Sequence, residues 1–519
     1  MFPLKRLLFA IILIYGMSRG FTVHAATAQY DTSDMEAEGF RKEQSMYDGN
    51  RNTYTDCKEE GTITITNPEG IAGVYVEFDR VPSPWTLLNP ATEEIIACGE
   101  NAFLHEYVAI DGVFETLPET LVLKFCAGTV IADVYAFTVG ELPDWVQVWQ
   151  PPCEAADIML LTTHSDDEQL FFAGLLPLYA GEKGVQVQVV YGVQHFEANG
   201  VANHQRPHEQ LDGLWTVGVR NYPIMPEFPD LYAESKNRET ALSQALKVYG
   251  AAGVAYEDFL EYITECLRRF KPLVVVSHDL NGEYGHGGHV VYAQVLTEAI
   301  HMAADETCFV ESFDRYGIWE TQKLYLHLYE ENPLVMDYDV PLEAFGGKTA
   351  FEVTQDGFAC HKSQHWTWFY KWIYGTADKP IKKATDIKSY SPCHFGLYYT
   401  QVGLDVQGGD FLENVITYEE RRIIAEKEAE EKRLAELEAQ RLAEEERKAE
   451  EARIKAEEER LEQEQKAAEE ARRKEQAALE EELQQEKAKK RTLALIGIGG
   501  AAFLVIVIAV ICRKKNRGE

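Results

Sequence analysis

Clustered basic charge is largely absent from this 519-residue sequence. It carries 50 lysine and arginine residues against 85 aspartate and glutamate residues, for a formal net charge of −35. Proteins that bind nucleic acid neutralise phosphates with clustered lysine and arginine side chains, so the sequence predicts no nucleic-acid partner. The chain is also too long for one ordinary domain, and two or three domains with appendages are expected.

Cysteine is sparse, and no two cysteines stand at Cys-x-x-Cys spacing. One of the nine, Cys512, ends the last apolar run, and the other eight are scattered between Cys57 and Cys393. An exported chain can oxidise such cysteines. Their spacing nevertheless assigns neither a disulfide framework nor a cysteine metal site.

The N-terminus has the three parts of a secretory signal peptide. A basic pair at Lys5-Arg6 precedes an apolar run over residues 7–15, and small residues follow at Ala25 and Ala28. This pattern predicts a signal peptide over residues 1–28, with cleavage after either alanine. The domains that follow are therefore expected to be exported.

Glycine and proline are missing from residues 418–490, which consist almost wholly of glutamate, alanine, lysine, arginine, glutamine and leucine. These strong helix formers predict a charged helix over residues 417–491, supported by i,i+4 pairs such as Glu444–Lys448. At about 1.5 Å per residue the helix would extend roughly 110 Å. Its leucines do not hold a coiled-coil register, so a single helical stalk and a self-associated coiled coil both fit.

Charged residues are absent from positions 493–512, which are apolar and long enough to span a bilayer. Basic residues flank this run on both sides, so their asymmetry alone leaves the orientation undecided. The signal peptide decides it. Residues 492–512 are expected to form a single transmembrane helix, and residues 513–519 are expected to form a cytoplasmic tail. No LPxTG-like pentapeptide precedes the run, which favours a retained single-pass anchor in the cell membrane with an extracellular N-terminal ectodomain.

The exported part begins with a β pattern over residues 29–150. Polar and apolar residues alternate along 62–66 and 74–78, and residues 121–125 and 130–139 are further strand candidates. Many short strands separated by turn residues are typical of an all-β sandwich or jelly roll.

Three stretches of this segment, residues 48–53, 73–78 and 104–107, resemble the discoidin (F5/8 type C, galactose-binding-like) family. The resemblance implies a carbohydrate- or surface-binding module. A structural sandwich that only packs on its neighbour fits equally well. Trp85 and Tyr107 are candidates for stacking on a sugar and equally for the domain core.

From Asp157 onward, strand and helix patterns alternate, which predicts a mainly parallel sheet with helices on both faces. This α/β domain is placed at residues 151–416. An aromatic-rich stretch over residues 366–374 could line a sugar site, although an aromatic helix packed on the core is favoured. The elements expected most clearly are strands at 158–162, 185–191, 272–277, 323–328 and 395–400, and helices through 178, from 206 toward 217, at 256–270 and at 290–303.

Two polar clusters follow strands of this sheet. Residues 163–168, Thr-His-Ser-Asp-Asp-Glu, come directly after the first strand, and His164 and Asp167 are spaced to reach one ion. His286 and His289 follow the strand at 272–277. The carboxyl ends of strands in open α/β sheets hold ligand sites, so both clusters are expected at one edge. Two histidines and one carboxylate suit zinc, and also non-haem iron.

The sequences THSDDE and NGEYGHGGH are similar to the HPDDE and GHxxH motifs of the PIG-L/LmbE family of metal-dependent N-acetylglucosamine deacetylases. The resemblance covers about residues 156–413. It implies a Rossmann-like α/β domain and a divalent metal, with Zn²⁺ as the expected ion. Carried over by position, it implies metal ligands at His164, Asp167 and His289, a general base at Asp166, an oxyanion-stabilising cation at His286, a polar helper at Tyr284 and a substrate contact at Arg206.

The chemistry of these side chains agrees with the resemblance. A metal ion ionises water near neutral pH, and a carboxylate such as Asp166 can take its proton and pass it to the leaving amine. Arg206 fits a substrate contact and a partner for an acid equally, whereas Glu168 is expected to serve the structure. Two positions depart from the family pattern: Ser165 stands where proline is usual, and Gly287-Gly288 where Pro-Asp is usual. Neither departure changes a residue proposed as a metal ligand or as the general base. The histidines at 195, 204 and 208 are expected at the surface.

The sequence therefore predicts a cell-surface hydrolase that removes the N-acetyl group from an N-acetylglucosamine-type sugar through metal-bound water. The alternative is a glycan-binding or adhesive surface protein whose deacetylase-like domain is silent. The complete set of site residues favours the enzyme. Peptidoglycan, mucin-type glycan, chitin fragments and glycolipid all remain as substrates, whereas export argues against a cytosolic thiol precursor.

Overall fold

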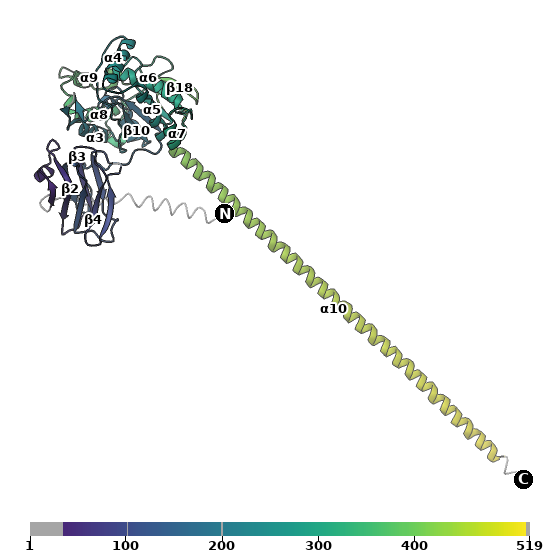
Figure 1. The fold of residues 1–519 in the computed structure, drawn as a ribbon. Coiled ribbons are helices and arrows are strands. Elements are labelled where there is room, and N and C mark those ends of the chain that lie inside the picture. Colours follow the sequence, from purple (N-terminus) through teal and green to yellow (C-terminus); the bar gives the residue numbers. More distant parts are fainter. Residues whose placement is uncertain (1–34, 101, 199–200, 515–519) are drawn as a thin grey trace. The chain divides into compact units, whose positions relative to one another are not determined.

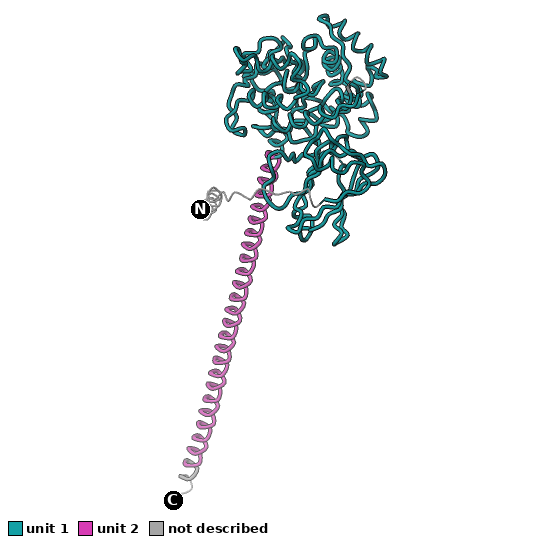
Figure 2. Tube along the Cα trace, turned by 90° about the vertical axis from the view of Figure 1, so that its left-hand side faces the viewer, with its two compact units in different colours: residues 1–422 teal, residues 423–519 magenta. Residues whose placement is uncertain are grey.

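The computed structural model describes residues 35–100, 102–198 and 201–514. The expected signal peptide and residues 515–519 of the expected tail lie outside the described residues. The chain divides into two compact units, residues 1–422 and 423–519 (Figure 2).

The first unit begins with a domain of eight antiparallel strands, here called the β-domain (Figure 1). The strand order is β5-β4-β7-β2-β8-β3-β6, and β1 also pairs with β2. The strands and one 3₁₀ turn are β1 (Met35–Phe40), η1 (Glu43–Met46), β2 (Thr55–Thr66), β3 (Gly73–Phe78), β4 (Trp85–Asn89), β5 (Glu94–Cys98), β6 (His105–Ala109), β7 (Thr120–Phe125) and β8 (Val130–Phe137).

Strand β2 joins two groups of strands in the β-domain. Its second half, from Gly61 to Thr66, pairs with β7, whereas Thr55 and Asp56 pair with β8. Alternate apolar side chains from both groups meet in one core. An antiparallel all-β segment is confirmed, and its assignment as a jelly roll stays a prediction. Trp85 is 2% exposed in that core, so a role in stacking on a sugar is wrong for this residue.

The second sheet of the first unit has the order β10-β9-β13-β14-β18-β15. Its first four strands are parallel, and β18 pairs in antiparallel fashion with both β14 and β15. A mainly parallel sheet was expected, and its assignment as Rossmann-like stays a prediction. The strands are β9 (Ile158–Thr162), β10 (Val187–Tyr191), β13 (Val274–Ser277), β14 (Lys323–His327), β15 (Pro333–Val335) and β18 (His394–Thr400).

Helices pack on both faces of this sheet. Successive strand residues point to opposite sides, so each strand contributes apolar side chains to two cores. Ile158 and Leu160 of β9 face a core shared with α3 and α8, whereas Met159 and Leu161 face a core shared with α4, α5 and α6. The helices are α2 (Asp167–Leu170), α3 (Arg206–Thr216), α4 (Arg238–Ala251), α5 (Tyr256–Phe270), α6 (Gly287–Met302), α7 (Val310–Tyr316), α8 (Ala350–Cys360) and α9 (Phe369–Tyr374).

Short elements complete the unit. They are the π-helical turn η2 (Pro177–Glu182), the 3₁₀ turns η3 (Glu283–Gly285), η4 (Glu343–Phe345), η5 (Lys362–Gln364) and η6 (Ala384–Asp386), and the two-residue strands β11 (Glu197–Ala198), β12 (Val201–Ala202), β16 (Gly375–Thr376) and β17 (Lys379–Pro380). Eight cysteines are free in the described residues.

The helix expected after β9 is shorter than the sequence predicts. Apolar spacing predicts one helix through Leu178, but α2 ends at Leu170. Gly174 has a φ of +90°, and a Cβ at this position would lie 2.2 Å from the Tyr338 ring. A right-handed helix cannot continue through that conformation, so glycine lets the chain turn tightly against its neighbour.

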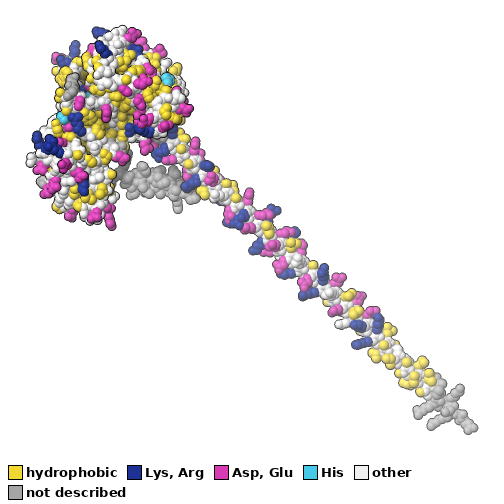
Figure 3. Space-filling model, viewed as in Figure 1, with side chains coloured by type: hydrophobic (Ala, Val, Ile, Leu, Met, Phe, Trp, Pro, Cys, Tyr) yellow, Lys and Arg dark blue, Asp and Glu magenta, His cyan; other side chains and the backbone are white. Residues whose placement is uncertain are grey.

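Helix α10 (Tyr418–Lys514) contains the expected charged and apolar segments in one continuous helix. Thr417 and Glu420 cap its start, because the Thr417 Oγ1 accepts from the Glu420 N–H and the Glu420 carboxylate accepts from the Thr417 N–H. Acidic and basic side chains alternate along it, and hydrophobic side chains gather toward its C-terminal end (Figure 3). Its apolar segment, with a mean hydropathy of 2.8, is long enough to cross a membrane.

Candidate metal and catalytic site

The two polar clusters meet where the order of the parallel strands reverses. Strand β9 lies between β10 and β13, and β13 pairs with β9 in parallel, so the carboxyl ends of β9 and β13 lie side by side. The first cluster, residues 163–168, follows β9, and the second, residues 278–289, follows β13. A crevice at such a reversal is the usual ligand site of an open α/β sheet.

Three side-chain atoms converge at this edge at the spacing of metal ligands. His164 Nδ1 lies 3.0 Å from Asp167 Oδ2 and 3.2 Å from His289 Nε2. His289 Nε2 lies 3.3 Å from the same Asp167 oxygen. Tetrahedral zinc with bonds of roughly 2.0–2.1 Å separates its ligand atoms by about 3.4 Å. All three residues are buried, and each belongs to a buried group that could hold a metal ion: His164 with His286 and His289, and Asp167 with His278 and His289.

Two further histidines border the three donors, and both nitrogens of His278 but only one nitrogen of His286 are engaged elsewhere. His278 Nε2 accepts from the Thr163 N–H at 2.9 Å, and its Nδ1 lies 2.8 Å from Glu283. His286 Nδ1 accepts from the Gly288 N–H at 3.2 Å. A nitrogen that already accepts a hydrogen bond has no lone pair for a metal. His286 Nε2 stays open, and His286 forms a candidate metal group with His164 and His289, so the set His164, Asp167 and His289 is favoured by the mutual spacing of its atoms.

Two carboxylates, the partly exposed Asp230 and the buried Glu283, contact the candidate histidine ligands from behind. Asp230 Oδ1 lies 3.4 Å from His164 Nε2, and Glu283 Oε2 lies 2.7 Å from His289 Nδ1. Burial by itself raises the pKa of each carboxyl. The surrounding histidines outweigh this effect and hold the pKa values of both carboxyls far below their usual range. Carboxylates that fix the far nitrogen of a ligating histidine are typical of zinc sites.

Asp166 is held beside the donors in an unusual backbone conformation. Its φ is 151°, which L-residues rarely adopt, and its N–H donates to Glu168 Oε2 at 2.9 Å. Strained residues of this kind cluster at functional sites. Burial raises the pKa of Asp166 to about 6, against the lowering effect of Arg206. Glu168 therefore serves to hold Asp166, as its predicted structural role requires.

His286 and Tyr284 lie on the other side of the donors. The rings of His286 and His164 are 4.7 Å apart, and the rings of Tyr284 and His289 are 5.6 Å apart. Burial lowers the pKa of His286 well below its usual value. Because Nδ1 accepts from the backbone, a neutral His286 carries its proton on Nε2. The geometry thus favours a neutral donor rather than the cation that the family resemblance implies.

Arg206, at the start of α3, pairs with acids of the site. Its Nη2 lies 3.4 Å from Asp166 Oδ1, and its Nη1 lies 3.6 Å from Asp230 Oδ2. Its Nε donates to Ser165 Oγ at 3.2 Å. Of the two roles that the sequence left open for Arg206, pairing with an acid is the one seen in these contacts.

Sequence reasoning missed four residues of this site: His195, Asp230, His278 and Glu283. His195 was expected at the surface, but it is 2% exposed and its Nε2 accepts from the Ser165 N–H at 2.9 Å. The polar residues around it in the sequence gave no sign that a buried backbone donor needs this acceptor. Glu283 lies inside the NGEYGHGGH stretch that resembles the family motif. That position was the signal by which the sequence could have marked it as a residue of the site.

The surface prediction is also wrong for His208, whereas His204 is partly exposed, and both contact the β-domain. His208 Nδ1 lies 2.7 Å from His105 Nε2, and both rings are buried. His204 Nδ1 lies 2.6 Å from the Asp79 carboxylate. A second domain contacts both histidines and buries His208, which local polarity does not report.

A partly buried polar network continues this contact between α3 and the β-domain. Arg51 bridges Glu77 of β3 and Asp212 of α3, at 2.7 Å from each carboxylate. Gln147 Nε2 donates to Asp212 Oδ1 at 2.6 Å. Because α3 carries Arg206 at its start, the β-domain packs on the helix that reaches the catalytic cluster.

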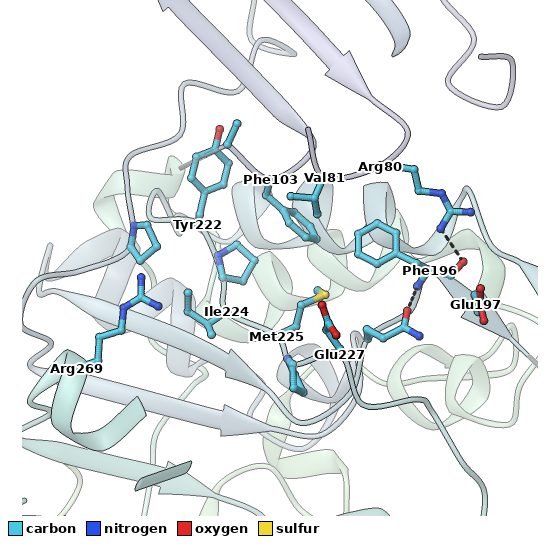
Figure 4. Close-up of a pocket in the computed structure, with 15 residues that line it drawn as sticks. Arg80, Val81, Phe103, Phe196, Glu197, Tyr222, Ile224, Met225, Glu227 and Arg269 are labelled. Carbon is cyan, nitrogen blue, oxygen red and sulfur yellow. Dashed lines mark hydrogen bonds between the residues drawn. The ribbon is translucent and has the colours of Figure 1, made fainter. Parts of the chain in front are cut away.

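A cleft of about 680 Å³ is lined by residues of the β-domain and of the segments that follow it (Figure 4). Arg80, Val81 and Phe103 come from the β-domain, and Arg80 donates to the Phe196 carbonyl at 3.3 Å. No proposed catalytic or metal residue lines this cleft. Its other lining residues are Ala102, Pro152, Gln194, Phe196, Glu197, Tyr222, Pro223, Ile224, Met225, Pro226, Glu227 and Arg269.

Two histidines, one carboxylate ligand and a second carboxylate at the edge of an α/β sheet match the donor set of catalytic zinc sites. Residues 159–300 match the PIG-L family, described as GlcNAc-PI de-N-acetylase. This part of the chain is therefore a deacetylase-like PIG-L domain.

Curated relatives point to the same family. The chain is 23% identical over 241 residues to a 1D-myo-inositol 2-acetamido-2-deoxy-alpha-D-glucopyranoside deacetylase 1 of Catenulispora acidiphila, covering 40% of this chain and 66% of that protein. It is 26% identical over 180 residues to a 1D-myo-inositol 2-acetamido-2-deoxy-alpha-D-glucopyranoside deacetylase of Mycobacteroides abscessus. This match covers 32% of this chain and 58% of that protein. The chain thus spans less than two thirds of the length of either relative.

The chain also has a weak similarity to solved structures. An N,N'-diacetylchitobiose deacetylase from Pyrococcus horikoshii matches 48% of this chain and 86% of its own, with 15% identity and a TM-score of 0.33. The family 32 carbohydrate-binding module of C. perfringens NanJ, solved in complex with galactose, is a second match. It covers 20% of this chain and 94% of that chain, with 14% identity and a TM-score of 0.17.

Proposed function

We propose that the chain is a divalent-metal de-N-acetylase that acts on an N-acetylglucosamine-type sugar, with zinc as its ion. The observation that carries the proposal is the convergence of His164 Nδ1, Asp167 Oδ2 and His289 Nε2 within 3.0–3.3 Å of one another, with Asp166 next to them in the chain. Fixed donors at that spacing suit a catalytic ion with an open coordination position.

A divalent ion held by these three residues supplies Lewis acidity for the amide carbonyl and lowers the pKa of a water molecule. Asp166 takes the proton of the attacking water and then delivers it to the nitrogen of the leaving amine. A carboxyl whose pKa is raised by burial to about 6 is suited to both steps near neutral pH. Arg206, 3.4 Å from Asp166 Oδ1, orients that carboxylate.

His286 stabilises the oxyanion that develops on the substrate carbonyl oxygen. Its Nδ1 is engaged by the Gly288 N–H, so the Nε2 proton of the neutral ring is available to donate. Tyr284, which packs against both His286 and His289, assists on the same side. Uncharged donors in a buried site stabilise developing charge without first having to lose water.

Acetate release from N-acetylglucosamine oligosaccharides tests the proposal. We expect the purified ectodomain to release acetate, to lose this activity after chelation and to regain it with zinc. Magnesium added to the chelated protein serves as the control, since its octahedral oxygen preference does not match this donor set. Failure to release acetate from any N-acetylated glycan, with zinc bound, would contradict the proposal.

We also propose that the domains follow the boundaries expected from the sequence and that the enzyme is anchored at the cell surface. The apolar segment of α10 and the signal peptide pattern of residues 1–28 support this arrangement. We expect the chain to remain in membranes after high-salt and alkaline washes and to require detergent for release. A chain ending at residue 491 should be secreted, and its retention in the membrane would refute the anchor.

A second function, glycan binding by the β-domain, is favoured by one observation. A hollow of about 480 Å³ is lined by Trp145 and Tyr135 together with Arg51, Glu77, Asn50, Asn52 and Gly49. Aromatic faces beside a few polar groups are the usual lining of a small-ligand site. If the ectodomain binds glycans but releases no acetate from them, this binding function is the better account.

A further inference from the structure

Two large aromatic side chains are exposed next to the candidate catalytic site. Tyr232 is 68% exposed and Trp368 is 48% exposed. Tyr232 lies two residues after Asp230, which contacts His164, and Trp368 comes directly before α9. Exposed aromatic side chains beside a functional site commonly mark a binding surface.

The two exposed rings extend a row that passes through the site itself. Tyr232 lies 5.5 Å from the His286 ring, His286 lies 5.6 Å from the Tyr284 ring, and Tyr284 lies 5.7 Å from the Trp368 ring. The two middle rings belong to the proposed catalytic machinery. Each exposed ring therefore lies one ring contact beyond it, on opposite ends of the row.

The segment that carries Tyr232 is fixed against the histidine cluster. Glu234 forms a β-bridge with His286, and the Gly287 N–H donates to the Ala233 carbonyl at 2.7 Å. The Tyr232 hydroxyl donates to the Glu234 carboxylate. These contacts hold the ring in place before a ligand binds, which lowers the entropy cost of binding.

Trp368 is held in a similar way. Its ring lies 4.2 Å from the Phe369 ring, which in turn lies 5.6 Å from Tyr284. The aromatic stretch at residues 366–374 was expected to be a helix packed on the core. Phe369 and Trp372 do pack on the core, whereas Trp368 contacts the site and remains half exposed.

We propose that Tyr232 and Trp368 are sugar-stacking subsites that flank the catalytic site, so that the substrate is an oligosaccharide of N-acetylated hexosamines rather than a single sugar. The inference rests on the proposed deacetylase function. The apolar face of a pyranose ring packs against an aromatic face, while its hydroxyls stay in water. The reacting sugar lies at His286 and Tyr284, and its neighbours in the chain lie on the two exposed rings.

The test compares acetate release from N-acetylglucosamine and from its tetrasaccharide. We expect Trp368→Ala and Tyr232→Ala each to lower the ratio of kcat/KM for the tetrasaccharide to kcat/KM for the monosaccharide by about tenfold, the equivalent of one good aromatic contact. The conservative Trp368→Tyr should retain most of the preference. Trp366→Ala is the matched control: Trp366 is 84% exposed, and no ring contact joins it to the site within the described residues.

The outcomes separate this inference from the function on which it rests. A wild-type enzyme that releases acetate from neither sugar refutes the deacetylase function, and the subsites with it. An active enzyme whose ratio is unchanged in Trp368→Ala and Tyr232→Ala refutes the subsites alone. A ratio that falls equally in Trp366→Ala also refutes them, since the effect would then belong to exposed aromatics in general.

Discussion

Replacing Asp166 with asparagine is expected to lower kcat for acetate release by about 10²–10⁴-fold, the usual contribution of a general base. Asparagine has the size of aspartate but cannot accept the proton of the attacking water. The Glu168 carboxylate accepts from the Asp166 N–H, and this backbone contact survives the substitution. Metal binding should also survive, because the favoured ligand atoms belong to other residues.

The matched control for this variant is its neighbour in the chain. Asp167→Ala removes one of the three favoured donor atoms and is expected to lose both metal and activity. If Asp166→Asn keeps the metal but loses activity, while Asp167→Ala loses both, Asp166 acts as the base and Asp167 as the ligand. If Asp166→Asn turns over at the wild-type rate, the assignment of Asp166 as the base is wrong.

Glu283→Gln is expected to weaken zinc binding by about 10–100-fold, the usual cost of losing an acid behind a histidine ligand. One Glu283 carboxylate serves three buried histidines: its Oε2 lies 2.7 Å from His289 Nδ1 and 2.8 Å from His278 Nδ1, and its Oε1 lies 2.6 Å from His327 Nδ1. Glutamine has a single carbonyl oxygen, so at least one histidine would face an amide N–H instead.

The same substitution should destabilise the fold by about 1–3 kcal/mol, because it leaves a buried polar group without its partner. Zinc competition with a chromophoric chelator measures the affinity, and thermal unfolding of the metal-free protein measures the stability. Glu261→Gln, at an exposed position on α5, is the control and should change neither. Unaltered zinc affinity in Glu283→Gln would show that His289 does not need this carboxylate.

The part of the site that sequence predicts well is the part set by local spacing. His164 and Asp167 are three residues apart and closely follow β9, whereas His286 and His289, also three apart, follow β13 after the turn η3. Parallel pairing of β9 and β13 then brings the two pairs together at one sheet edge. Spacing along the chain and the geometry of parallel sheets were sufficient to place them.

The part that sequence misses depends on contacts between distant segments. Asp230 lies in an irregular stretch between α3 and α4, without periodicity or motif, yet its carboxylate reaches His164. His208 is buried only because His105 of another domain covers it. Helix α2 ends early because Gly174 turns against Tyr338, a residue more than 160 positions away. None of these contacts has a signal within the local sequence.

The metal content of purified ectodomain variants tests the central claim most directly. The account predicts one zinc per chain in the wild-type protein and in Asp166→Asn, and loss of that zinc in Asp167→Ala and in His289→Ala, with all four proteins folded by circular dichroism. Zinc retained at one equivalent in both ligand variants would contradict the site built from His164, Asp167 and His289.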